Sequence, residues 1–160
     1  MNEMESPPVS LALDQLGVAH QVFRHPGPVT SLEQAAEERN QRPEQVVRSI
    51  VFRLSKGEYV MVLMAGPDLI SWSALRTYLG RSRLTTASRE EILQVTGYEL
   101  GAVAPFGLPA PMRVLIDASV LEQEALSLGS GVRGTAIIMK SGDLITALGG
   151  AEVGRFGKSS

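Results

Sequence analysis

Two β-rich segments joined by a short turn constrain the fold of this chain more than any other feature. Residues Val46–Arg53 and Glu58–Ala65 are dominated by β-branched, aromatic and other large apolar side chains. Between them, Ser55-Lys56-Gly57 has the composition of a tight turn. We expect the two segments to pair as a hairpin, around which the other elements must be placed.

The other segments mix helix and strand patterns without the regular alternation that a doubly wound sheet requires. This mixture predicts an α+β fold. Capping residues and terminal glycines place helices after Ser6, at 31–38, from Ser71 to Gly80 and from Ser88 to Gly97, and β patterns place strands at 18–24, 81–86, 112–117 and 135–139. A short helix or turn is expected at 119–126, and a last helix at 144–148 is expected to be capped by Ser141-Gly142-Asp143.

The length of 160 residues fits one domain that can bury a substantial core without covalent staples. No repeat of 20–50 residues is apparent. We therefore predict a single domain over 1–160 with its core at about 9–148, and a frayed, flexible, glycine-rich tail at 149–160.

The composition excludes several classes of protein. The chain has no cysteine, which removes disulfides, thiolate nucleophiles and thiolate metal sites together. Met1–Ser6 is acidic and polar, unlike a secretory signal, and apolar runs such as Val60–Ala65 are too short to span a bilayer as a helix. We expect a soluble, cytoplasmic protein with no membrane partner.

The formal net charge of −2 does not fit a nonspecific nucleic-acid coat. Twelve of the 15 cationic residues are arginine, and nine of the twelve fall in the first hundred residues. Arginine's planar fork matches phosphate oxygens, so a clustered face could bind RNA. A GC-rich genome would give the same bias without any function, and the composition leaves both explanations open.

Catalytic motifs of the common kinds are missing from the sequence. His20 and His25 are the only histidines, and neither belongs to a metal-ligand motif such as HExxH. There is no Gly-x-Ser-x-Gly elbow and no phosphate-binding loop of the GxxxxGK[ST] type. We therefore predict no metal and no cofactor.

Three other features could bind an anion. The segment Gly97–Gly107 interleaves three glycines and Pro105 with apolar residues, which suits either a loop that presents its main chain to an acceptor-rich ligand or a buried connection. Gly129-Ser130-Gly131 could hold an anion on its amides or form a tight turn. In the strand, Arg48 shares a face with Ile50 and Phe52, where it could meet an anion, pair with a carboxylate or reach water.

Four motifs in a fixed order resemble one known family. They are Arg48-Ser49-Ile50-Val51-Phe52; Thr96-Gly97-Tyr98 through Gly101-x-x-x-Pro105-Phe106-Gly107; Gly129-Ser130-Gly131-x-Arg133-Gly134; and Asp143-Leu144. Over roughly Val9 to Leu148 the chain resembles the YbaK/prolyl-tRNA synthetase-associated domain family of trans-editing aminoacyl-tRNA deacylases. The resemblance implies a mixed, barrel-like sheet surrounded by helices.

The resemblance also implies a function and partners. It implies hydrolysis of the ester between a small, wrong amino acid and tRNA, often the tRNA for proline, by a freestanding protein. The expected partners are the 3′ end of aminoacyl-tRNA and an aminoacyl-tRNA synthetase, and no cofactor is needed. In this family a ribose hydroxyl of the substrate is thought to help the attacking water.

The family's functional residues carry over by position. The catalytic residues implied are Arg48, Gly101, whose main chain would contact the aminoacyl carbonyl group, and Asp143. The implied substrate-binding residues are Phe23, His25, Thr30, Ala102, Pro105, Gly129, Ser130 and Gly131.

Two positions depart from the family pattern. The usual lysine is replaced by Arg48, which stays protonated and cannot act as a general base, although it can still bind phosphate or orient the terminal adenosine. A tyrosine of some members is replaced by Phe23, which lacks the hydroxyl. Two alternatives to an enzyme stay open: a noncatalytic module that binds a tRNA end, a synthetase or a small ligand, and an interaction protein whose glycine loops are only structural.

Overall fold

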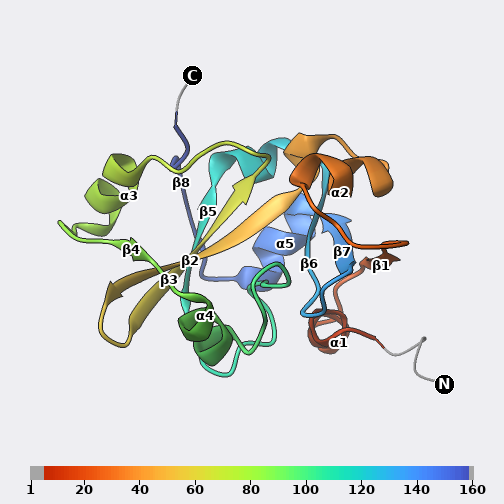
Figure 1. The fold of residues 1–160 in the computed structure, drawn as a ribbon, viewed down its shortest axis with the longest axis horizontal. Coiled ribbons are helices and arrows are strands. Elements are labelled where there is room, and N and C mark those ends of the chain that lie inside the picture. The colour runs from red at the N-terminus through yellow and green to blue at the C-terminus, as the bar shows by residue number, and fades with distance from the viewer. Residues whose placement is uncertain (1–5, 159–160) are drawn as a thin grey trace.

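The hairpin lies in a five-stranded sheet, as expected from its sequence. In the computed structural model, which describes residues 6–158, β2 (Val47–Ser55) pairs antiparallel with β3 (Glu58–Ala65). The short strand β4 (Thr85–Thr86) pairs with the outer edge of β2. On the other side, β5 (Arg113–Asp117) and β8 (Glu152–Gly154) continue the sheet as parallel strands, giving the order β4-β2-β3-β5-β8 (Figure 1).

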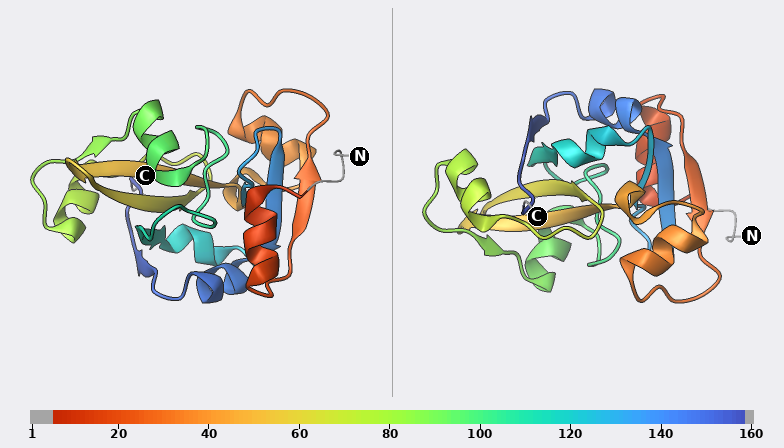
Figure 2. Two further views of the ribbon diagram at one scale, coloured as in Figure 1. Left: turned by 90° about the horizontal axis from the view of Figure 1, so that it is seen from below. Right: turned by 90° about the horizontal axis from the view of Figure 1, so that it is seen from above.

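A second, three-stranded antiparallel sheet lies at the other end of the molecule (Figure 2). Its order is β1-β7-β6, formed by β1 (Gln21–Arg24), β7 (Thr135–Lys140) and β6 (Ala125–Gly129). Val46, just before β2, pairs with Ser127 of β6 in an isolated bridge that joins the two sheets. The α+β class is confirmed, with the mixed β-structure divided between two connected sheets.

Five α-helices lie around the sheets in the described part of the chain. They are α1 (Pro8–Gln15), α2 (Leu32–Glu38), α3 (Trp72–Leu79), α4 (Arg89–Thr96) and α5 (Ser141–Leu148). Two 3₁₀ turns, η2 (Pro43–Gln45) and η3 (Ala118–Glu122), connect elements. Among residues 6–158, no helix combines the length and the apolar character needed to cross a membrane.

Local capping chemistry explains three of these helices. Ser31, Ser71 and Ser88 each accept a hydrogen bond from the amide three residues later, at the starts of α2, α3 and α4. The helices α3 and α4 end at Gly80 and Gly97, which adopt the left-handed conformation that glycine tolerates.

The expected caps of α1 and α5 are wrong. The N-cap of α1 is Pro7 rather than Ser6, and no side chain caps this end. The helix α5 begins at Ser141, with Lys140 as an N-cap that makes no side-chain bond, so Asp143 lies inside the first turn. Both helices are fixed by packing, since Val9 and Leu144 are fully buried.

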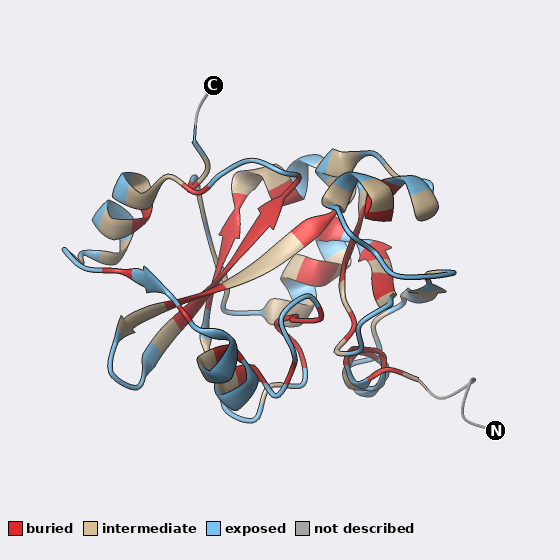
Figure 3. Ribbon diagram, viewed as in Figure 1, coloured by how far each residue is buried: buried red, intermediate tan, exposed pale blue. Residues whose placement is uncertain are grey.

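The core has two clusters on opposite faces of the larger sheet. The first joins both sheets through residues such as Met61, Leu63 and Leu126. The second packs Phe52 and other residues beneath α3. Figure 3 shows that β3 and β5 are the most continuously buried strands, because elements cover both of their faces.

The expectation of a frayed, flexible tail at 149–160 is wrong for residues 149–158. The strand β8 pairs with β5, and the side chain of Phe156 is fully buried in the second cluster. The amide of Phe156 donates to Oδ1 of Asp117 at 2.6 Å, and the amide of Lys158 donates to the carbonyl of Leu69 at 2.8 Å. The core therefore extends beyond residue 148, while 159–160 lie outside the described residues.

Candidate functional site

A cavity of about 950 Å³ lies beside β2 and α2. The loops that follow β1, α4 and β6 provide the rest of its wall, so segments distant in sequence meet there. Four of the predicted site residues line it: His25, Arg48, Gly101 and Gly129.

The charge of the cavity is opposite in sign to that of the whole chain. Arg24, Arg39, Arg48 and Arg133 line it, and no aspartate or glutamate of the described residues does. The chain as a whole has a net charge of −2. Cations gathered in a hollow with partly apolar walls concentrate the field on a bound anion. The cavity therefore suits an anionic ligand.

The loop 97–107 is buried over 102–106 and exposed over 99–101. Ala102 and Pro105 are buried, whereas Leu100 and Gly101 are exposed and line the cavity. Gly101 has a φ of 96°, and no acceptor within residues 6–158 takes its amide proton. The loop is thus partly a buried connection, and the binding of a ligand to its main chain stays a prediction.

Hydrogen bonds hold that loop in place. The hydroxyl of Tyr98 donates to the carbonyl of Phe106 at 2.6 Å and closes the loop on itself. The amide of Gly131 donates to the carbonyl of Ala102 at 2.9 Å. The loop is therefore fixed to the turn that follows β6.

The turn Gly129-Ser130-Gly131 packs closely against the loop 97–107. A Cβ on Gly129 would lie 2.3 Å from the carbonyl oxygen of Val103, and one on Gly131 would lie 2.9 Å from Cε1 of Tyr98. Ser130 is fully buried and bonds Thr135 and the main chain of Val132. Of this motif only Gly129 lines the cavity, which favours the tight turn over an anion-binding nest.

Arg48 lines the cavity, but its guanidinium is bound to the main chain. Nε donates to the carbonyl oxygen of Gly66 at 2.8 Å, and Nη2 donates to that of Asp68. Burial lowers the pKa of Arg48, and the nearby Asp68 opposes this effect. Arg48 thus connects β2 to the loop that follows β3. The sequence had suggested an anion, a carboxylate or water as its partner, but not main-chain carbonyl groups.

Ser49 also lines the cavity, and its hydroxyl is buried next to it. It lies on the opposite face of β2 from Arg48, as strand alternation predicts, and it lines the cavity beside Val47 and Val51. Its Oγ is buried and has no hydrogen-bond partner in the part of the chain that the structure describes. A buried polar group without a partner is costly, so a ligand that bonds to it gains affinity.

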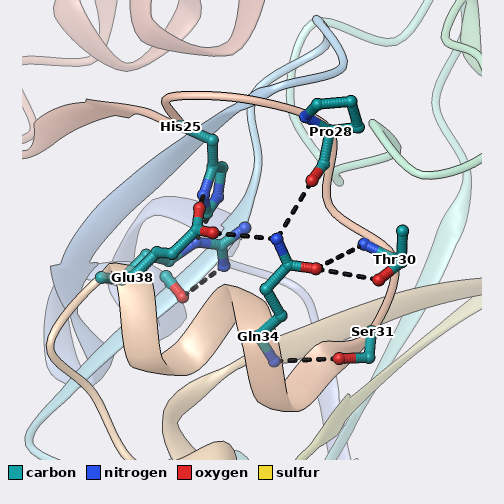
Figure 4. Close-up of polar contacts among 8 residues, drawn as sticks. His25, Pro28, Thr30, Ser31, Gln34 and Glu38 are labelled. Atoms are coloured by element: carbon teal, nitrogen blue, oxygen red, sulfur yellow. Dashed lines mark hydrogen bonds and ion pairs between the residues drawn. The ribbon is translucent and has the colours of Figure 1, made fainter.

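His25 is the centre of a polar network at one end of the cavity. Its Nδ1 lies 2.6 Å from Oε1 of Glu38, and its Nε2 accepts from Nε of Arg39 at 3.1 Å (Figure 4). The imidazole is 1% exposed and contacts the ring of Phe23 edge to face, with 4.9 Å between centroids. Because both nitrogens are engaged, His25 has no free position for proton transfer.

The loop between His25 and α2 is fixed by Gln34. This side chain accepts from the amide and the hydroxyl of Thr30, and it donates to the carbonyl of Pro28 and to Oε2 of Glu38 (Figure 4). The wall of the cavity at 27–32 is therefore attached to the same network.

Several predicted site residues do not reach the cavity. Asp143 lies half-buried in α5, and no residue of that helix lines the cavity with Arg48 and Gly101. Asp143 is thus not brought together with the other two predicted catalytic residues. The predicted substrate-binding residues that do not line the cavity are Phe23, Thr30, Ala102, Pro105, Ser130 and Gly131.

Three residues that line the cavity were not among the predicted site residues: Ser49, Arg24 and Arg39. Arg133 was predicted only as the end of the Gly129–Arg133 turn. Ser49 carried a usable signal, since it is the one polar side chain between Val47 and Val51 on a buried strand face. Nothing local marks Arg39, which follows the last turn of α2. No group of three or more histidine, aspartate or glutamate side chains within 6–158 is arranged to hold a metal ion.

Comparisons with known proteins point to one family. A family model described as an aminoacyl-tRNA editing domain matches residues 26–147. The proline–tRNA ligase of Kosmotoga olearia is 30% identical over 102 residues, which is 64% of this chain and 17% of the ligase. The proline–tRNA ligase of Streptococcus pneumoniae is 28% identical over 106 residues, 66% of this chain and 17% of the ligase. The chain thus matches about a sixth of the length of these relatives.

A solved structure shows the same fold. It is described as a proposed trans-editing enzyme for prolyl-tRNA synthetase, and it superposes with a TM-score of 0.87 at 25% identity. The superposition covers 95% of this chain and 96% of that chain.

Proposed function

Because the chain belongs to the aminoacyl-tRNA editing domain family, we propose that it hydrolyses the ester between a small, wrong amino acid and the 3′ end of a tRNA. The proline–tRNA ligase relatives and the trans-editing neighbour favour the tRNA for proline as substrate and prolyl-tRNA synthetase as a partner. The cytoplasm is the location that we propose for this function. One observation carries the proposal: Gly101, whose amide has no acceptor within residues 6–158, lines a cavity that contains arginines and, among the described residues, no carboxylate.

The charge of the cavity matches the chemistry of aminoacyl-tRNA. The ester has no charge, the α-amino group is cationic and the phosphates of the RNA are anionic. We place the RNA end near the arginines and the aminoacyl group near Ser49, Val47 and Val51. Small apolar walls with one free hydroxyl suit a small amino acid.

Gly101 stabilises the reaction in this proposal. When water attacks the ester carbon, the carbonyl oxygen becomes an oxyanion, and the free amide of Gly101 donates to it. One such donor contributes about 3 kcal/mol of transition-state stabilisation. The bond from the carbonyl carbon to the ribose oxygen then breaks, the ribose oxygen takes a proton, and the products are the free amino acid and the tRNA.

No histidine or carboxylate that lines the cavity in the described part of the chain is free to act as a general base for the attacking water. Arg48 stays protonated, both nitrogens of His25 are engaged, and no carboxylate lines the cavity within residues 6–158. We therefore assign the proton transfer to the ribose hydroxyl next to the ester. Arg48 positions β2, and Asp143 has no part in this proposal.

A panel of mischarged tRNAs tests the function. Wild-type protein is expected to release one or more small amino acids faster than buffer does, and no cleavage for any of them would refute the proposal. Gly101→Ala keeps the backbone amide but puts a side chain at a φ of 96°, which alanine rarely adopts, so the amide must move. A displacement of about 1 Å should slow release by about a hundredfold. Gly80→Ala is the matched control, since Gly80 also has a positive φ, 67°, and open space around it but lies at the end of α3.

A noncatalytic module that binds tRNA ends is the second candidate. The absence of a free histidine or carboxylate among the described residues lining the cavity favours it. It predicts tRNA binding that weakens with added salt and no ester cleavage in the same panel.

A further inference from the structure

Arg39 is an arginine of the cavity wall whose guanidinium is held by hydrogen bonds to other side chains. It lies at the end of α2, lines the cavity and is held by two side chains. Nε donates to Nε2 of His25 at 3.1 Å, and Nη1 donates to Oγ of Ser127 at 2.8 Å. Ser127 is fully buried and also donates to Oε1 of Gln41 at 2.7 Å. These two hydrogen bonds therefore fix the direction of the Arg39 guanidinium.

The carboxylate of Glu38 acts on the charge of Arg39 but forms no ion pair with it in the described part of the chain. Both carboxylate oxygens are already occupied, Oε1 by His25 and Oε2 by Gln34. Arg39 forms no ion pair within residues 6–158. Burial lowers the pKa of Arg39 to about 10, so it remains a cation at neutral pH without a direct counter-ion.

The hydrogen bond from Arg39 engages Nε2 of His25, and Nδ1 of the same ring lies against Oε1 of Glu38. The remaining nitrogen of Arg39, Nη2, donates to no acceptor in the described part of the chain. Nη2 of Arg39 can therefore donate to a ligand.

We propose that Arg39 binds a phosphate group of the nucleotide at the RNA 3′ end, with His25 and Ser127 as its positioning residues. This inference rests on the proposed function, because that function supplies the ligand. In an aminoacyl-tRNA the amino acid's carboxyl group is esterified and its amino group is cationic, so the phosphates are its anions. A planar guanidinium pairs well with phosphate oxygens.

Two nucleotide probes isolate the phosphate contact. Adenosine and adenosine 5′-monophosphate differ only in the group that occupies the place of the linkage to the preceding nucleotide. Titration of the full chain, followed by NMR, is expected to give a dissociation constant at least about tenfold lower for the monophosphate, as for other hydrogen bonds between charged groups. Arg39→Gln should remove this difference, and Arg39→Lys should keep part of it.

Arg42→Gln is the matched control. Arg42 is a nearby exposed cation that does not line the cavity, and it donates to Oε1 of Gln123 at 2.6 Å. This variant should keep the full difference between the two probes. Ser127→Ala tests the site if Arg39→Gln does not fold, and it should reduce the difference at least threefold, because the guanidinium loses one of its two supports.

The inference is overturned if wild-type protein binds both probes equally, or if Arg39→Gln keeps their difference. Free L-alanine supplies a further test. The inference is also overturned if L-alanine displaces the monophosphate from wild type but not from Arg39→Gln, because Arg39 would then recognise a carboxylate. A phosphate-dependent difference in a protein that cleaves no mischarged tRNA would support Arg39 while refuting the hydrolytic function. Cleavage of a mischarged tRNA by a protein that binds both probes equally would support the hydrolytic function and refute the role of Arg39.

Discussion

Replacing Gly129 with alanine should displace the loop that carries Gly101. Gly129 has no positive φ, so the effect of a side chain is purely steric. The added Cβ would lie 2.3 Å from the carbonyl oxygen of Val103 and 2.8 Å from two main-chain atoms of Ala102. Ordinary contacts begin near 3.4 Å, so the loop backbone must move by about 1 Å.

The cost follows from that displacement. Overpacking of this kind destabilises a core by about 1–3 kcal/mol. Because Gly101 adjoins Ala102, its amide moves too, and a misplacement of about 1 Å can slow a reaction about a hundredfold. We therefore expect Gly129→Ala to reduce both the free energy of unfolding in urea and the rate of deacylation.

Gly142→Ala is the control for this experiment. Gly142 lies in the first turn of α5, and a Cβ there meets nothing within 4 Å. Alanine at this position should leave the rate unchanged and raise the free energy of unfolding by about 0.5 kcal/mol. The steric reasoning is refuted if Gly129→Ala unfolds within about 0.5 kcal/mol of wild type and deacylates at the full rate.

Three other variants test the packing and the charges. Phe156→Ala should lower the free energy of unfolding by about 3–5 kcal/mol because the ring is fully buried, and a loss below about 1 kcal/mol in urea would restore the idea of a loose tail. Arg113 donates to Glu152 at 2.7 and 2.9 Å and thereby lowers the pKa of Glu152 to about 2. The ion pair therefore contributes fully to the free energy of unfolding above about pH 4.5, and this contribution is lost as the pH falls toward 2. Both side chains are exposed, so Glu152→Gln should cost at most about 1 kcal/mol in urea at pH 7 and nothing at pH 2, and an equal cost at both pH values would contradict the assignment. Arg48→Ala should lower the free energy of unfolding by about 1–3 kcal/mol, with Arg48→Lys between it and wild type, because the carbonyl of Gly66 loses its donor; an unchanged urea transition in Arg48→Ala would show that this bond is unimportant.

Local chemistry made much of the fold predictable. The hairpin follows from two apolar runs and one turn, and the starts of α2, α3 and α4 follow from serine caps. Each of these features depends on residues within a few positions of one another. The opposite directions of Arg48 and Ser49 also follow from strand geometry alone.

The tail shows where local reasoning fails. Its glycines suggested an unanchored segment, but β8 pairs with β5, more than 30 residues earlier in the chain. The burial of Phe156 depends on a core cluster that residues of other elements build. A composition rule cannot detect such a partner.

The sequence by itself determined the family resemblance and the α+β class. Tertiary structure alone decided which side chains meet in the cavity: it gathered Arg39, Ser49 and Arg133, left Asp143 outside and bound Arg48 to the main chain. The physical reason is that motif order is a property of the chain, whereas a binding site depends on which segments pack together. The close approach of Gly129 to Val103 is one such contact, and it places the exposed amide of Gly101.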